Sequence, residues 1–490
     1  MTTIANDPFA LQDPALLRRQ PYVDGRWRSG DGAPIAVANP ATGASLGEVE
    51  TLSPAAVIET IDAAERALPA WKALPARERA NRLERWHDLI LQHADDLARI
   101  MTLEQGKPLA EARGEIAYGA SFAKWFAGEA VRAYGEIVPT PARDRRVLVL
   151  REAVGVCAAI TPWNFPSAMI VRKTAPALAA GCTIVLKPAE TTPFSALALA
   201  ELAQRAAIPA GVFNVVLGDP PAIGKAFAAH PAVRKLSFTG STRTGRLLLA
   251  QAAEQVQKVT LELGGNAPFI VFDDADVDAA VEGAIAAKFR NAGQVCVAVN
   301  RIFAHESVAA RFTERLAARA AALKVGNGLD PDTQVGPLIN RAALDRVAGL
   351  VDDVKTRGGK IVAGGKPHKL GGLFFEPTVV AGAPTDACIW REEIFGPLVT
   401  VTPFRDETEA LRLANATEYG LASYFYTRDL GRAFRVAEGL QFGMVGVNVP
   451  FVSSECAPFG GVKASGIGRE GSRHGIEDYL EIKTVWVGGI

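Results

Sequence analysis

Apolar side chains follow two different spacings along the chain, and the change comes near residue 154. Between residues 53 and 100 they recur every three or four positions, which predicts helices. Ser53-Pro54 is typical of a helix start. A second helix is expected over about 77–100, with one side formed by Leu83, Trp86, Ile90, His93 and Leu97. We interpret His93 as a core histidine.

About the first 20 residues are expected to form a tail or strap.

From Val154 onward, short apolar runs alternate with helical segments. The runs begin at 154, 183, 212 and 233, and helices are expected from about 167, 195 and 221 and after Gly240. Such alternation predicts βαβ units, a parallel sheet and the α/β fold class, with ligands at the carboxyl ends of the strands. A second alternating stretch, from 269 to about 465, predicts a second α/β domain. Segments 136–152 and 479–487 are expected to form extended ribbons, whose free edges favour pairing with another subunit.

The composition excludes several classes of protein. Lys plus Arg and Asp plus Glu both number 53 in 490 residues, and this balance argues against nucleic acid or an anionic membrane as a partner. No apolar run is long enough to span a membrane, and the first residues lack the layout of a signal peptide, so a soluble cytoplasmic protein is expected. The histidines form no ligand cluster, so no metal site is expected. The cysteines are scattered, which suits a reducing compartment: Cys157, Cys182, Cys296, Cys388 and Cys456.

Three segments carry candidate catalytic groups. Cys296 in FRNAGQVCVAVNR is either a nucleophile or a small buried thiol. Glu262 ends a strand run just before Gly264-Gly265, where a carboxylate is a candidate general base or a solvated loop acid. Asn164 in TPWNFP offers an amide donor held between two prolines, as an oxyanion stabiliser requires, or is a turn asparagine.

Other segments favour a dinucleotide. Lys187 and Glu190 in LKPAETTP follow a strand, where they are either ligands for an adenosine ribose or a surface ion pair. FTGSTRTG, at 238–245, is a junction of strand, glycine and helix that suits a pyrophosphate, although it also reads as a helix-capping turn and is not a GxGxxG fingerprint. The segments REEIFGP and APFGGVKASGIGREG, with Glu393, Phe395 and Phe459, indicate structured loops.

Together these motifs resemble the aldehyde dehydrogenase superfamily. The resemblance runs from NPATG at 39 to the tail and includes PWNFP, KPAE, FTGS, LELGG, GQVC, GLDPDTQVGPLI, REEIFGP and PFGG. It implies a Rossmann-like cofactor domain (1–133 and 154–264), a catalytic domain (265–465) and an oligomerisation ribbon (134–153 and 474–490). It also implies a homodimer or homotetramer.

The same resemblance implies residue roles. Cys296 would be the nucleophile and Glu262 the general base, while Asn164 and the backbone N–H of Cys296 would hold the oxyanion. The implied cofactor contacts are Thr161, Pro162, Trp163, Lys187, Glu190, Gly240, Ser241, Glu393 and Phe395. The cofactor is expected to be NAD, because the negative charge of Glu190 repels a 2′-phosphate; family members with this acid sometimes also accept NADP.

Within the superfamily the chain most resembles succinate-semialdehyde dehydrogenases, in segments such as NFPSAMIVRKTAPALAAGC and GREGSRHGIEDYLEIK. Arg172, Arg290 and Ser453 match residues that this group uses on the far carboxylate of its substrate. A guanidinium suits such a carboxylate, although either arginine could instead cap a helix or pair with a structural acid. Many members have a second cysteine where this chain has Ala298, so the redox disulfide of that group is not expected here. The other cysteines are interpreted as structural, with Cys456 a candidate for the wall of the substrate tunnel.

Several functions remain open at this point. Succinate semialdehyde is the first substrate hypothesis, with glutarate semialdehyde as a near neighbour. A neutral or cationic aldehyde would use the same mechanism. A catalytically silent protein on this scaffold, or a cysteine hydrolase with a base such as His305, would be of another class.

Overall fold

The structure, a computed structural model, describes residues 9–490. The expected N-terminal tail lies partly outside this range. From Phe9 onward the segment packs against the body as a strap, since Phe9 and Leu16 are fully buried.

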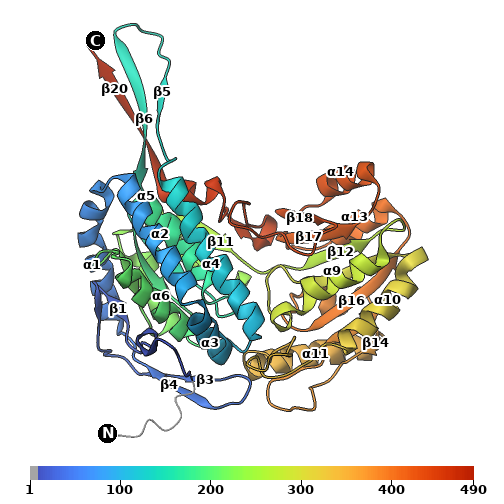
Figure 1. Cartoon of the computed structure of the whole chain (residues 1–490). Helices are drawn as coiled ribbons and strands as arrows, with labels where there is room; N and C mark the ends of the chain where they lie inside the picture. Colours follow the sequence, from blue (N-terminus) through green and yellow to red (C-terminus); the bar gives the residue numbers. More distant parts are fainter. Residues whose placement is uncertain (1–8) are drawn as a thin grey trace, which may run out of the picture.

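An eight-stranded sheet forms the core of the first lobe (Figure 1). Its order is β19-β11-β10-β7-β8-β9-β1-β2, and the five strands from β11 to β9 are parallel, as predicted. β8 is buried along its whole length, which follows from helices that cover both faces. The strands are β1 (Tyr22–Val23), β2 (Arg26–Trp27), β7 (Val156–Ile160), β8 (Thr183–Lys187), β9 (Phe213–Val215), β10 (Val233–Thr239), β11 (Lys258–Glu262) and β19 (Gly466–Ile467).

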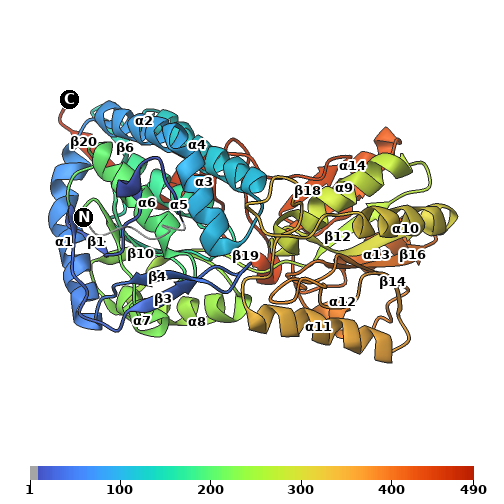
Figure 2. The same cartoon turned by 60° about the horizontal axis from the view of Figure 1, so that its bottom comes forward.

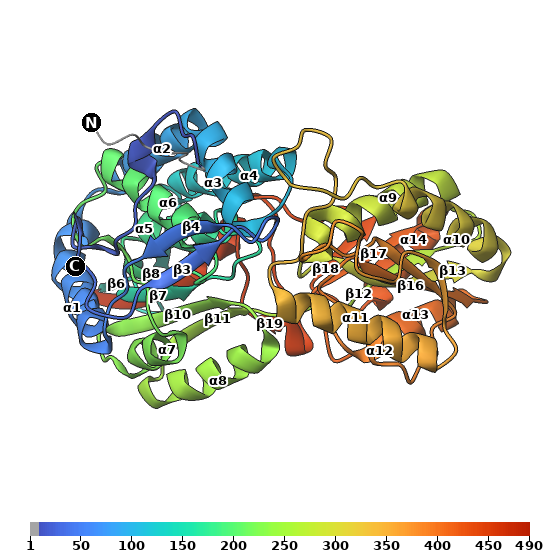
Figure 3. The same cartoon turned by 90° about the horizontal axis from the view of Figure 1, so that it is seen from below.

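Helices pack on both faces of this sheet. Figure 3 shows α7 and α8 on one side and α5 and α6 on the other. Ser53 caps α1 as expected, because its hydroxyl accepts the N–H of Ala56. The helices are α1 (Pro54–Ala73), α2 (Ala76–Gln92), α3 (Ala94–Gln105), α4 (Leu109–Ala130), α5 (Ala168–Ala180), α6 (Pro193–Arg205), α7 (Pro220–Ala229) and α8 (Thr242–Ala252).

The single helix expected over 77–100 is wrong, because the chain breaks at His93 into α2 and α3. His93 has a non-helical ψ of 20°, and Asp95 and Asp96 follow it in the first turn of α3, where acidic side chains suit a helix start. The His93 ring lies 3.9 Å from the carboxylate of Asp13 in the strap. His93 therefore joins two helices and the strap and is not a core residue.

A seven-stranded sheet forms the core of the second lobe, in the order β14-β15-β16-β13-β12-β17-β18. All its strand pairs are parallel except β14–β15. Its strands are β12 (Ala267–Val271), β13 (Val299–His305), β14 (Lys360–Ala363), β15 (Thr378–Ala381), β16 (Leu398–Phe404), β17 (Ala422–Tyr426) and β18 (Met444–Val447). Its helices are α9 (Val277–Phe289), α10 (Glu306–Ala321), α11 (Arg341–Thr356), α12 (Cys388–Arg391), α13 (Glu407–Asn415) and α14 (Leu430–Gly439).

Two smaller sheets complete the fold. β5 (Glu136–Val138), β6 (Arg145–Ala153) and β20 (Leu480–Gly488) form a ribbon that projects from the first lobe, as the sequence predicts (Figure 1). β3 (Ile35–Ala38) and β4 (Ser45–Val49) form a hairpin on the first lobe (Figure 2). Within residues 9–490, no helix combines the length and apolarity needed to cross a membrane.

Residues 263–266 carry the chain directly from the first sheet to the second. β11 ends at Glu262 and β12 begins at Ala267. The carboxyl edge of the first sheet therefore faces the amino edge of the second, and the two lobes lie side by side across this crossing (Figure 3).

Candidate active site

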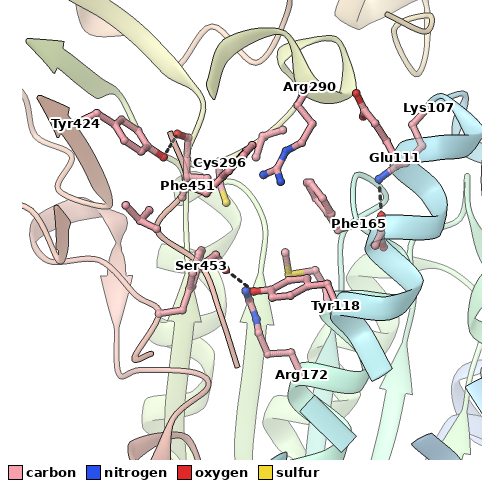
Figure 4. A pocket seen from close by; sticks show the side chains of 17 residues that line it. Lys107, Glu111, Tyr118, Phe165, Arg172, Arg290, Cys296, Tyr424, Phe451 and Ser453 are labelled. Atoms are coloured by element: carbon pink, nitrogen blue, oxygen red, sulfur yellow. Dashed lines mark hydrogen bonds and ion pairs between the residues drawn. The ribbon is translucent and has the colours of Figure 1, made fainter. Parts of the chain in front are cut away.

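Two cavities meet at Cys296, between the lobes. One, of about 370 Å³, contains the side chains shown in Figure 4, and the other, of about 350 Å³, lies toward the first sheet. Cys296 and Met169 line both cavities. The second cavity also contains several residues proposed from sequence: Pro162, Trp163, Asn164, Gly240, Ser241, Glu262, Glu393 and Phe395. The structure thus brings most of the predicted site together.

The segment before Cys296 has an irregular backbone. Asn291, Ala292 and Gly293 have φ values of 50°, 54° and 73°, in the left-handed region. Only glycine fits at 265, because a Cβ there would lie 2.4 Å from the carbonyl oxygen of Cys296. The crossing between the sheets and the segment that holds the thiol are therefore in direct contact.

The Cys296 thiol is neutral in this environment. Burial raises its pKa to about 12, although the positive charge of Arg172 opposes the shift. A thiol is a weak nucleophile until it loses its proton, so the site must supply a base or a stabilising charge before Cys296 reacts.

Asn164 follows β7 and is held from several sides. Its Nδ2 donates to the carbonyl of Gln294 at 3.0 Å, which ties the amide to the Cys296 segment. The backbone carbonyl of Asn164 accepts hydrogen bonds from Lys107 Nζ at 2.7 Å and from Asn291 Nδ2 at 3.1 Å. Because an amide nitrogen carries two protons, one N–H of Asn164 remains for a ligand in the cavity.

Glu262 is a buried carboxyl group at the end of β11, as the sequence predicts. Both of its oxygens lack a hydrogen-bond partner among the described residues. Burial, and the nearby charge of Glu470, raise its pKa well above the usual range, while Arg172 and Lys173 oppose the shift. An unpartnered acid with a raised pKa, beside a cysteine, is suited to proton transfer.

The predicted cofactor residues fit a dinucleotide in part of the second cavity. The hydroxyl groups of Thr161 and Thr239, at the ends of β7 and β10, are buried and have no hydrogen-bond partner within residues 9–490, and Thr239 lines this cavity. Ser241 caps α8, so the helix N-terminus opens into the same cavity. These unpartnered donors and the helix end suit the phosphates and hydroxyls of such a cofactor.

Glu393, Trp163 and Phe395 form another part of this cavity. The rings of Trp163 and Phe395 meet edge to face at 5.6 Å. Glu393 accepts the N–H of Gly265 at 2.9 Å, and burial raises its pKa to about 7.

Lys187 and Glu190 lie outside this cavity. The two side chains contact one another in an ion pair, but Lys187 is buried, so the pair is not the surface ion pair that was the alternative interpretation. The backbone carbonyl of Lys187 accepts the N–H of Thr161 at 3.0 Å. The Lys187–Glu190 ion pair therefore lies next to Thr161, another residue expected to contact the cofactor.

The two arginines differ in their partners. Arg172, on α5, is fully buried, with its Nε 2.6 Å from Glu470 and its guanidinium 4.2 Å from the Phe459 ring. It lines the first cavity, yet it also pairs with a structural acid.

Arg290 projects into the first cavity (Figure 4). Its guanidinium lies 5.4 Å and 5.1 Å from the ring centres of Phe165 and Phe451. It forms no ion pair or hydrogen bond with any residue of the described range, and nearby Glu111 accepts the backbone N–H of Asn291 instead.

Sequence reasoning missed several residues of the first cavity. Tyr118 contacts the hydroxyl of Ser453 through a hydrogen bond, and Lys107 and Glu115 form a buried pair. Glu115 and Tyr118 lie on α4, where helical spacing does not reveal which cavity a side chain enters, and Lys107 lies in the turn before it. Cys456 does not line this cavity but a cleft at the base of the ribbon.

The chain resembles known proteins over nearly its whole length. The model of the aldehyde dehydrogenase family matches residues 27–485. Glutarate-semialdehyde dehydrogenase from Pseudomonas aeruginosa is 57% identical over 98% of this chain and 100% of its own length. Succinate-semialdehyde dehydrogenase [NADP(+)] GabD from Escherichia coli is 56% identical over 98% of this chain and 99% of its own. The crystal structure of succinate-semialdehyde dehydrogenase from Burkholderia pseudomallei has a TM-score of 0.97 and 57% identity, covering 98% of this chain and 100% of that one.

The raised pKa of Cys296 predicts slow, pH-dependent alkylation. In the protein without added cofactor, the rate of iodoacetamide reaction at Cys296 is expected to rise about tenfold per pH unit between about pH 7 and 9, because only the thiolate reacts. Peptide mapping by mass spectrometry separates Cys296 from the exposed Cys456. A rate that stays constant over this range would mean that the thiol is already ionised.

Proposed function

The chain belongs to the aldehyde dehydrogenase family, and on this premise we propose that it oxidises succinate semialdehyde to succinate with NAD or NADP. The match confirms the resemblance and the α/β fold class expected from sequence. The observation that carries the substrate proposal is Arg290, a guanidinium without an acid partner in the cavity of Cys296. Glutarate semialdehyde, one carbon longer, is the alternative substrate and is supported by the same group.

In the proposed mechanism, the Cys296 thiol gives its proton to water, and the sulfur then forms a bond to the aldehyde carbon. The carbonyl π electrons move to oxygen, and the free N–H of Asn164 and the backbone N–H of Cys296 stabilise the resulting negative charge. Each such donor lowers the barrier by about 3 kcal/mol. A dinucleotide held by Ser241, Glu393 and Phe395 would supply the acceptor for the hydride that leaves this carbon.

Glu262 then acts on water. Oxidation leaves a thioester on Cys296, and Glu262 removes a proton from water as the water oxygen adds to the thioester carbon. The carbon–sulfur bond breaks, the carboxylate product leaves, and the electron pair returns to the sulfur. The raised pKa of Glu262 makes it a stronger base for this step.

The polar groups of the first cavity support a substrate with a negative far end. Arg290 offers a charge-assisted hydrogen bond between two aromatic rings that exclude water. Arg172 and Ser453 lie in the same cavity and are proposed to assist, although Arg172 already faces Glu470. A neutral aldehyde would leave Arg290 without a partner, and a cationic one would be repelled.

The cofactor preference is proposed from Glu190. Its carboxylate, held by Lys187, would accept ribose hydroxyls and repel a 2′-phosphate, which favours NAD over NADP. The other proposed contacts are Thr161, Pro162, Trp163, Gly240, Ser241, Glu393 and Phe395.

The domain division and the assembly are also proposals. The eight-stranded and seven-stranded sheets support a cofactor domain (1–133 and 154–264) and a catalytic domain (265–465). The ribbon (134–153 and 474–490) exposes Ile137, Ile482 and Trp486, at 72%, 63% and 61%, which supports pairing with a second copy in a homodimer or homotetramer. The five free thiols suit the reducing cytoplasm.

The hydrolase alternative has no support in the site. His305 bonds to Ser307 and to the carbonyl of Arg405 at the far end of β13, and it lines neither cavity. Glu262, whose two oxygens have no partner among the described residues, lines a cavity together with the thiol.

Replacing Arg290 tests the substrate proposal. Arg290→Met is expected to lower kcat/KM for succinate semialdehyde by about 10- to 100-fold, because a charge-assisted hydrogen bond contributes about 1.5–3 kcal/mol. Activity on butanal should change by less than about threefold. Arg113→Met, on the surface of α4, is the matched control. Equal losses for both substrates would remove the carboxylate-binding role.

Replacing Glu190 tests the cofactor preference. Glu190→Gln is expected to raise kcat/KM for NADP relative to NAD by about tenfold, since it removes the charge that opposes the 2′-phosphate. Steady-state assays with each cofactor measure the ratio, with Glu254→Gln as the surface control. An unchanged ratio would place the discrimination elsewhere.

Charging the ribbon tests the assembly. The double variant Ile482→Glu/Trp486→Glu is expected to reduce the molar mass in light scattering after gel filtration, because it places charges on an apolar contact surface. Leu430→Glu, at an equally exposed apolar position on α14, serves as the control. A mass that is the same in wild type and the ribbon variant would show that the ribbon does not hold the assembly together.

A further inference from the structure

A buried ion pair lies behind the proposed oxyanion donor. Lys107 and Glu115 both have side chains that are 1% exposed, and both line the cavity of Cys296 (Figure 4). Lys107 belongs to the turn between α3 and α4, and Glu115 to α4. Neither residue has a part in the mechanism described above.

Lys107 holds the backbone of Asn164. Its ammonium donates to the Asn164 carbonyl at 2.7 Å and to Glu115, and it lies 4.1 Å from the ring centre of Phe165. Asn291 donates to the same carbonyl at 3.1 Å. The peptide that carries the Asn164 side chain is therefore fixed by a charged donor and a neutral one.

Glu115 holds the other end of the same turn. Its Oε1 accepts the N–H groups of Ser167 and Ala168 at 2.9 Å and 3.1 Å, at the start of α5. A carboxylate there satisfies backbone donors that the helix leaves free and suits the positive end of its dipole. Lys107 and Glu115 thus fix both ends of residues 164–168.

The arrangement is costly for a purely structural contact. Two charges removed from water lose several kcal/mol of hydration each, on the order of what their attraction returns, so the attraction between the two charges contributes little net stability. Burial lowers the pKa of Lys107, and the charge of Glu115 opposes that shift. What the pair adds is a fixed position for the turn, and a displacement of about 1 Å at a reacting group costs about 100-fold in rate.

We propose that Lys107 and Glu115 are positioning residues that hold the Asn164 amide where it meets the substrate oxygen. This inference rests on the oxyanion role of Asn164 in the proposed function. The pair itself touches no reacting atom.

The test is a double-mutant cycle with propanal, an uncharged aldehyde on which the anion-binding groups have no effect. Lys107→Met is expected to lower kcat by about 30-fold with KM changed less than about threefold, because the lost interaction is with the transition state. In the Asn164→Ala background the same change should cost less than about threefold. Lys107→Arg, which keeps the donor charge, should recover at least half of the lost activity.

A second readout separates position from folding. The alkylation rate of Cys296 without cofactor should stay within about twofold of wild type in Lys107→Met, since this reaction needs no oxyanion donor. If that variant does not fold, Lys107→Met/Glu115→Gln, a neutral pair with acceptors for Ser167 and Ala168, takes its place in the cycle. Equal losses from the change at Lys107 in both backgrounds would overturn the inference. Full activity in Asn164→Ala alone would instead refute the role of Asn164 in the proposed function.

Discussion

The short crossing between the two sheets is the constraint on which the site depends. Only residues 263–266 separate β11 from β12, so Glu262 ends one sheet immediately before the other begins. A Cβ at Gly264 would lie 2.6 Å from the Glu393 carboxylate, and one at Gly265 would lie 2.4 Å from the Cys296 carbonyl. The two glycines let groups from both lobes approach the same backbone, and this contact places the thiol beside the strand ends of the first sheet.

Charge compensation around Glu470 is the second condition for the chemistry. Glu470 lies between Arg172 and Lys173, and although burial would raise its pKa, these two cations lower it. Glu262, nearby, has no such partner and its pKa rises. One buried carboxyl group is thus held ionised while another can exchange a proton, which is the separation that acid–base chemistry in a closed site requires.

The sequence predicted the parts of the site that lie at strand ends, because alternating strands and helices fix which edge a residue occupies. Asn164 after β7, Ser241 after β10 and Glu262 in β11 were found in this way. For the second sheet the carboxyl-end rule does not hold, since Cys296 precedes β13 and so lies at its amino edge. The residues alone left Cys296 as either a nucleophile or a small buried thiol, and the resemblance to a known family favoured the nucleophile. Glu470 was missed because its partners, Arg172 and Lys173, are distant in sequence. Lys107 was missed because its contact with the Asn164 carbonyl joins distant segments, and the break at His93 was missed because helical spacing continues across it.

The cations of the substrate cavity are not equivalent, and the difference bears on selectivity. Lys107 has its own acid partner in Glu115, whereas Arg172 shares Glu470 with Lys173. The charge of Arg290 acts on Glu111, but the carboxylate of Glu111 is engaged by the N–H of Asn291, and burial raises its pKa against the charges of Lys107 and Arg290. Arg290 is therefore the cation of this cavity that has no acid partner among residues 9–490. A substrate with a single negative charge at its far end would pair with Arg290. Its neutral aldehyde group would then contact Cys296 and the hydrogen-bond donors beside it.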